Sequence, residues 1–136
     1  MLTHTRQSAV TVACEQWLVS LLAAGRRVIV PEITDYEVRR ELLRMGRAKA
    51  ITRLDALAGA TEYLPIATAA MRRAAELWAL ARQQGQPTAG DNTIDADMIL
   101  AGQALTLGVA DLVIATTNVG HLSRFVPAEL WQNVPA

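Results

Sequence analysis

Acidic residues that could act together occur in two separate stretches of the chain. Glu37 and Glu41 lie one helical turn apart, and they share a face if this stretch is helical. Asp95 and Asp97 precede a run of small and apolar residues. Carboxylates held close together repel each other unless a cation lies between them. Oxygen donors without nearby Cys or His suit hard cations, so these residues indicate a site for Mg²⁺ or Mn²⁺.

Each of these acidic residues also has a structural interpretation. Thr34 and Glu37 have the spacing of a capping box, in which both side chains bond the backbone at the start of a helix. Glu41 can pair with an arginine on the helix surface. Asp95 suits the first turn of a helix, where a carboxylate gains from the helix dipole. Asp97 fits this interpretation less well, because it lies further into the expected helix, on a face where an unpaired charge is costly.

Hydroxyl and amide side chains follow the most apolar stretch of the chain, Leu112 to Ala115. They include Thr116 and Asn118. A continuous apolar stretch is typical of a buried parallel strand, and open parallel sheets bind ligands beyond the carboxyl ends of their strands. We therefore expect these polar side chains to be able to orient a ligand at the edge of a sheet.

Basic residues are concentrated in one part of the chain. They are Arg39, Arg40, Arg44, Arg47, Lys49 and Arg53. A single acidic residue, Glu41, lies among them, whereas the net charge of the whole chain is zero. The planar guanidinium group suits phosphate, and Arg40 or Arg44 could also neutralise the carboxylates in place of a metal ion. A solvated helical face with ion pairs three or four residues apart is the more ordinary interpretation.

The apolar pattern predicts long helices that alternate with short strands, one of which, residues 27–31, leads into the helix of Glu37. We expect helices over residues 8–24, 34–45, 48–57, 68–84 and 94–107, and strands over residues 27–31, 61–66 and 112–115. Residues 85–92 and 116–123 are expected to be loops, and residues 125–131 to pack on the body of the protein. Strands joined by helices pair in parallel through right-handed crossovers, which predicts a three-layer α/β/α sandwich with a short parallel central sheet.

Length and composition fit one soluble domain over residues 1–136, with 51% hydrophobic residues. No apolar run approaches the length of a membrane span, and the first residues lack a secretory signal. The single cysteine, Cys14, cannot form an internal disulfide and is expected to be a packed thiol in a reducing cytoplasm. A flavodoxin-like nucleotide or regulatory domain is disfavoured, because glycine-rich phosphate turns are missing.

Three segments in order resemble motifs of the PIN domain family. They are residues 31–42, PEITDYEVRREL, residues 97–104, DMILAGQA, and residues 115–122, ATTNVGHL. The resemblance extends over nearly the whole chain. It implies a PIN-like three-layer fold and a metal-dependent endoribonuclease that uses Mg²⁺ or Mn²⁺. Many small members of the family are toxins of bacterial toxin–antitoxin pairs, so the resemblance also implies an antitoxin protein as a partner.

The resemblance assigns roles to individual residues of this chain. Glu37 and Asp97 match acidic metal ligands of the family, and Asp95 would be an auxiliary ligand. Asn118 would hold a metal-bound water or the substrate phosphate, and Thr116 would support it. The basic stretch, including Arg40 and Arg44, would guide the RNA backbone into the cleft.

The chain departs from the family pattern at its start. Members begin with an apolar strand that ends in an Asp ligand, whereas no Asp precedes Asp35 here. Asn118 also stands where many members carry an acid. We therefore expect weakened Mg²⁺ binding, and an exposed sheet edge that favours a homodimer. The alternative function is a non-catalytic module of the same fold that binds RNA or a protein partner.

Overall fold

The computed structural model of the chain describes residues 4–85, 91–116 and 119–135. The chain divides into a small unit around helix α1 (His4–Ala23) and a larger unit, Ile29–Val134. Helix α1 ends as expected at Gly25, which has a positive φ of 75° and donates its backbone N–H to the carbonyl oxygen of Leu22. Cys14 lies half-buried in α1, and burial raises the pKa of its thiol, which fits the expected packed thiol.

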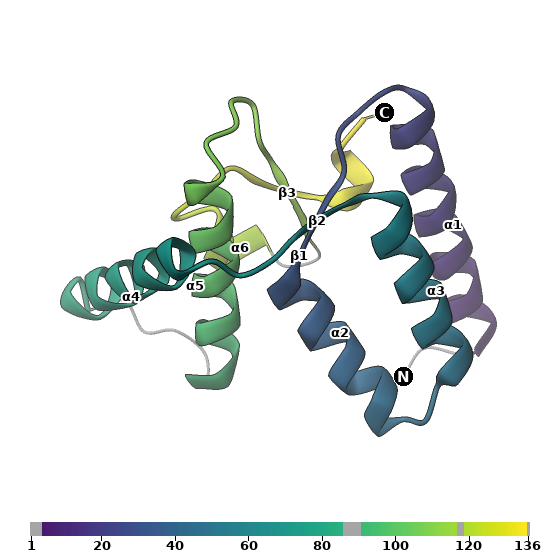
Figure 1. The fold of residues 1–136 in the computed structure, drawn as a ribbon, viewed down its shortest axis with the longest axis horizontal. Helices are drawn as coiled ribbons and strands as arrows, with labels where there is room; N and C mark the ends of the chain where they lie inside the picture. Colours follow the sequence, from purple (N-terminus) through teal and green to yellow (C-terminus); the bar gives the residue numbers. More distant parts are fainter. Residues whose placement is uncertain (1–3, 86–90, 117–118, 136) are drawn as a thin grey trace. The chain divides into compact units, whose positions relative to one another are not determined.

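The larger unit is mixed α/β and mostly helical, and it holds every candidate residue of the two acidic stretches (Figure 1). Its elements are β1 (Ile29–Pro31), α2 (Glu32–Arg44), α3 (Ala48–Ala60), β2 (Glu62–Leu64), α4 (Thr68–Gln83), α5 (Asp91–Thr106), β3 (Ile114–Thr116), α6 (Val119–Leu122), β4 (Ala128–Leu130) and the short 3₁₀ helix η1 (Trp131–Asn133).

Parallel pairing joins the strands two by two. Strand β1 pairs with β2 in the register Ile29 to Glu62, and β3 pairs with β4 in the register Ile114 to Ala128. Helices α2 and α3 connect the first pair, as expected for parallel strands. Among the described residues, these four strands form two separate two-stranded sheets, whereas the sequence predicted one central sheet.

Two segments near the carboxyl end differ from the prediction. Residues 119–122 form the short helix α6 within the expected loop, and residues 128–130 form strand β4 within the expected packed tail. A strand of three residues is too short to show a two-residue alternation of polar and apolar side chains. Its pairing with β3 is what defines it, and this pairing is not visible in the sequence.

Helix α2 begins earlier than the sequence predicted. Pro31 ends strand β1 and is also the N-cap of α2, with a φ of −70° and no capping side chain. The fixed φ of proline suits both positions, so the chain turns directly from the strand into the helix. Thr34 therefore lies within the first turn of α2, and the capping-box interpretation of Glu37 is wrong.

Helix α5 also begins earlier than predicted, at Asp91. Its first turn consists of residues 91–94, so Asp95 lies beyond the position where a carboxylate caps a helix. The interpretation of Asp95 as a first-turn residue is therefore wrong. Neither Asp95 nor Glu37 has the capping role that the sequence suggested for it.

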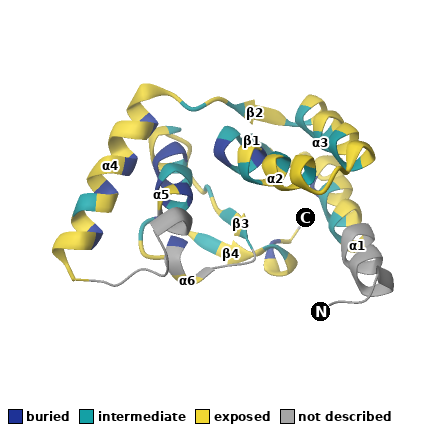
Figure 2. Ribbon diagram, turned by 90° about the horizontal axis from the view of Figure 1, so that it is seen from below, coloured by how far each residue is buried: buried dark blue, intermediate teal, exposed yellow. Residues whose placement is uncertain are grey.

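The core of the larger unit lies where α4 packs against α5. It consists of Ala74, Leu77, Ala81, Met98, Ala101, Leu122 and Val126. Figure 2 shows the buried residues of α4 on the side that faces α5. Small side chains allow the two helix backbones to approach closely, and the closest approach is at Gly102. A Cβ atom at this position would overlap the carbonyl oxygen of Ala70 and lie 3.2 Å from the backbone nitrogen of Ala74.

Gly102→Ala is expected to lower the free energy of unfolding by about 1–3 kcal/mol, because backbone atoms of α4 cannot move aside cheaply. Gly59→Ala is the matched control, since Gly59 also lies in a helix but has open space at its Cβ position. This control is expected to raise stability by about 0.5–1 kcal/mol. Urea unfolding of both variants measures the difference, and a stable Gly102→Ala protein would contradict the close packing.

A buried glutamine fixes α5 against the first sheet. Gln103 is 1% exposed, its Oε1 accepts a hydrogen bond from the backbone N–H of Ile33 (3.4 Å), and its Nε2 donates to the carbonyl oxygen of Leu64 (3.0 Å). Ile33 lies in the first turn of α2, and Leu64 ends β2. One side chain of α5 thus bonds both the start of α2, just after β1, and the last residue of β2. This contact holds α5 beside the start of α2, where the candidate site lies.

Candidate functional site

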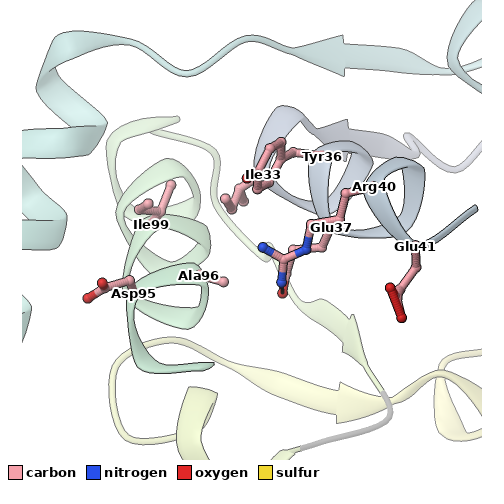
Figure 3. Close-up of a pocket in the computed structure, with 8 residues that line it drawn as sticks. All are labelled: Ile33, Tyr36, Glu37, Arg40, Glu41, Asp95, Ala96 and Ile99. Carbon is pink, nitrogen blue, oxygen red and sulfur yellow. Dashed lines mark ion pairs between the residues drawn. The ribbon is translucent and has the colours of Figure 1, made fainter. Parts of the chain in front are cut away.

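A cavity of about 730 Å³ lies between α2 and α5 (Figure 3). Its walls are formed by Ile33, Tyr36, Glu37, Arg40 and Glu41 from α2 and by Asp95, Ala96 and Ile99 from α5. Residues three or four positions apart share a face of a helix, so each wall is one helical face. The sequence predicted two of these acidic residues, Glu37 and Asp95, as members of one site, and the structure places both on this cavity.

Glu37 and Asp97 interact electrostatically across the two helices. Burial raises the pKa of Glu37, the positive charge of Arg40 opposes this rise, and the negative charge of Asp97 adds to it. Asp97 lies half-buried on α5. The charge of a residue on α5 thus acts on a residue of α2, although the two helices are far apart in the sequence.

Asp95 faces differently from its neighbour Asp97. It is exposed, and Figure 3 shows its carboxylate directed away from Glu37, although it lines the cavity. Residues two positions apart on a helix are about 200° apart around the axis. Asp97, rather than Asp95, is the carboxylate of α5 whose charge raises the pKa of Glu37.

Arg40 is the basic residue on the cavity wall. Its Nη2 lies 3.9 Å from Oε2 of Glu37, and its guanidinium carbon lies 5.2 Å from the centre of the Tyr36 ring. Arg44 is exposed and lies outside the cavity wall. Its Nε donates to Oε2 of Glu41 at 2.8 Å, which confirms the predicted surface pair of these two residues.

The rest of the basic stretch consists of one bridging arginine and three exposed side chains. Arg39 donates two hydrogen bonds of 3.1 Å to Asp35 and one of 2.7 Å to Asp55, so it ties α2 to α3. Asp35 is only 8% exposed, and these bonds raise the pKa of Arg39. Within this stretch, Arg47, Lys49 and Arg53 have no ion pair to any described residue. Most arginines of α2 in this stretch therefore form ion pairs on a solvated helical face, which was the more ordinary interpretation of the sequence.

The third predicted motif is described in part. Thr116 is the last residue of β3, half-buried and opposite Leu130 of β4. It therefore lies at the carboxyl end of a parallel strand, as expected. Asn118 lies outside the described residues.

Sequence reasoning gave no role to Tyr36, although it lies on the cavity wall directly before Glu37. The signal was available in the sequence. Tyr36 lies three residues after Ile33 and four before Arg40, so the three share a face of any helix through this stretch. Gln103 was missed because its role depends on partners in other elements, and Asp35 because its burial is not visible in the sequence.

The geometry defines a mixed α/β protein with two short parallel sheets and a carboxylate-lined cavity between two helices. No protein-family model matches the chain, and no curated protein or solved structure matches it. Among the described residues, no three His, Cys, Asp or Glu side chains gather as a metal-binding group. Within the same part of the chain, no helix is long and apolar enough to cross a membrane.

Asp97→Asn is expected to lower the pKa of Glu37, because the substitution removes the negative charge that disfavours the carboxylate. A titration of the Glu37 carboxyl group by NMR measures the pKa in both proteins without metal. Glu76→Gln is the control, since Glu76 lies on α4 and pairs with Arg73. An unchanged pKa of Glu37 in Asp97→Asn would show that the two carboxylates do not interact.

Proposed function

We propose that this chain is a PIN-like, metal-dependent ribonuclease domain whose Glu37 and Asp97 share one divalent cation. The observation that carries the proposal is that Glu37 of α2 lines the cavity and is acted on by the charge of Asp97 of α5. Helix α2 follows β1 directly, so Glu37 lies beyond the carboxyl end of a parallel strand. Ligand sites of parallel sheets are found at this position.

The donor atoms fit the proposed cation. Mg²⁺ is bound in proteins by one or two carboxylates, with the remaining positions left to water and substrate phosphate, and Mn²⁺ takes similar oxygen ligands. When bound, the cation supplies the positive charge that stabilises phosphodiester hydrolysis. The chain itself contributes Glu37 and Asp97 to hold this charge. Arg40, on the same wall, can donate hydrogen bonds to a phosphate oxygen.

The proposal includes the PIN-like three-layer arrangement and the partners that the resemblance implies. Parallel strands, helical connections and the order of the three motifs along the chain support it. Each described strand pairs on one side only, and an unpaired strand edge supports a homodimer. A cytoplasmic setting, an RNA substrate and an antitoxin partner belong to the same proposal.

A non-catalytic module that binds RNA or protein is the second candidate. One observation favours it. Arg40 lies 3.9 Å from Glu37, and Arg44 bonds Glu41, so protein cations already neutralise two carboxylates of the cavity. An ion pair of this kind can take the place of a bound metal.

Cleavage of labelled single-stranded RNA by the purified chain tests the proposal. The reaction is run with Mg²⁺, with Mn²⁺ and with excess EDTA. We expect cleavage that depends on the added cation and stops with EDTA. RNA binding without cleavage under all three conditions would favour the non-catalytic module.

A further inference from the structure

Tyr36 is an exposed aromatic side chain beside the acidic pair. It is 55% exposed, although the helix face it shares with Ile33 lines the cavity. Figure 3 shows Tyr36 next to Ile33 on the part of α2 that faces α5. More than half of the side chain is therefore open to solvent. The ring is thus available to a ligand in the cavity.

The guanidinium group of Arg40 lies over this ring. Its guanidinium carbon lies 5.2 Å from the ring centre, and its Nη2 lies 3.9 Å from Oε2 of Glu37. The cationic group is therefore close to both the aromatic ring and the carboxylate. An aromatic ring beside a guanidinium group offers a stacking surface together with donors for a phosphate.

We propose that Tyr36 is a stacking surface for one nucleobase of single-stranded RNA, next to the site of cleavage. This inference rests on the proposed function and names the substrate class of the same cavity. Bases stack readily on exposed aromatic rings in proteins that bind single strands. The phosphate attached to the stacked base then lies near Arg40. Since Tyr36 and Glu37 are neighbours on α2, the base and the cleaved bond are close together.

Stacking on Tyr36 requires an unpaired base, which single-stranded RNA offers and duplex RNA does not. A base in a duplex is already stacked on its neighbours and paired, and only an unstacked base can cover the Tyr36 ring. The net charge of zero also gives the chain little general attraction for a phosphate backbone. Stacking therefore supplies binding that charge alone does not.

Binding of fluorescein-labelled single-stranded RNA in EDTA tests the inference separately from cleavage. We expect Tyr36→Leu to raise the dissociation constant about tenfold and Tyr36→Phe to leave it nearly unchanged, because stacking needs the ring and not the hydroxyl group. Trp78→Leu is the matched control. Trp78 is also exposed and has Arg82 over its ring at 4.9 Å, but it lies on α4, outside the cavity wall.

Each outcome of this experiment decides the inference. A loss specific to Tyr36→Leu, for single strands and not for duplex RNA, supports it even if no cation-dependent cleavage is found. Equal binding by wild type and Tyr36→Leu overturns it, as does an equal loss in Trp78→Leu. Absence of single-strand binding by the wild type also overturns it. Circular dichroism confirms that each variant is folded.

Discussion

Asp97→Asn is expected to lower the rate of Mn²⁺-dependent RNA cleavage at least about 100-fold, because it removes one of two carboxylates proposed to hold the cation. The amide has nearly the same shape as the carboxylate, so the packing of α5 is kept. The initial rate with labelled single-stranded RNA, measured at several Mn²⁺ concentrations, gives the effect. A higher Mn²⁺ concentration is expected to restore part of the rate.

Asp95→Asn is the control for this substitution. Asp95 lies on the same helix, only two residues away, but its carboxylate is directed away from Glu37 (Figure 3). We expect Asp95→Asn to keep most of the activity. If both variants lose activity equally, the direction of each carboxylate on α5 does not decide which residue binds the cation. An electrostatic effect of either residue on RNA binding is then the better explanation.

Gln103→Met is expected to lower the free energy of unfolding by about 2–4 kcal/mol, because it removes the side-chain partner of one buried and one partly buried backbone group. These groups are the N–H of Ile33 and the carbonyl oxygen of Leu64. Methionine has a similar length and volume, so the effect reports the lost hydrogen bonds rather than a cavity. Urea unfolding followed by circular dichroism measures it.

Gln83→Met provides the comparison, since Gln83 is exposed at the end of α4. A surface substitution of this kind is expected to change stability by less than about 0.5 kcal/mol. Equal stabilities of the two variants would mean that Gln103 does not hold α5 against β1 and β2. Because this contact positions the cavity walls, Gln103→Met is also expected to weaken the interaction of Glu37 with Asp97.

Local signals in the sequence predicted most helix ends correctly. Gly46, Gly85 and Gly108 each follow a helix and have positive φ values of 68°, 63° and 71°. A residue without a Cβ adopts this backbone conformation at little cost, so these stops can be found without any tertiary contact. The order of the first five helices and of the first three strands was predicted for the same reason.

Features that depend on distant residues were not predicted. Strand β4 exists through its pairing with β3, and Gln103 acts through a partner 70 residues away. Helix α2 begins at Glu32 because the strand before it ends at a proline, whereas the sequence suggested a start at Thr34. Single-sequence patterns report local preferences and carry little information on such pairings.

The candidate site was predicted only in part. The resemblance to the PIN domain family brought Glu37 and Asp97 together, and helical spacing alone could not have done so. The structure adds Tyr36 and Arg40 to the same wall and places Arg44 outside it. Asp35 and Arg39 lie four residues apart on α2, so their bonds could have been predicted from spacing, whereas the burial of Asp35 could not.

Mn²⁺ binding to the purified chain is the most direct measurement of the proposed site. The paramagnetic resonance signal of free Mn²⁺ is recorded during a titration of the wild type, Glu37→Gln and Asp97→Asn. We expect the wild type to bind the ion and each variant to bind it much more weakly, at least about 10-fold. Equal binding by all three proteins, or no binding by the wild type, would contradict a cation shared by Glu37 and Asp97.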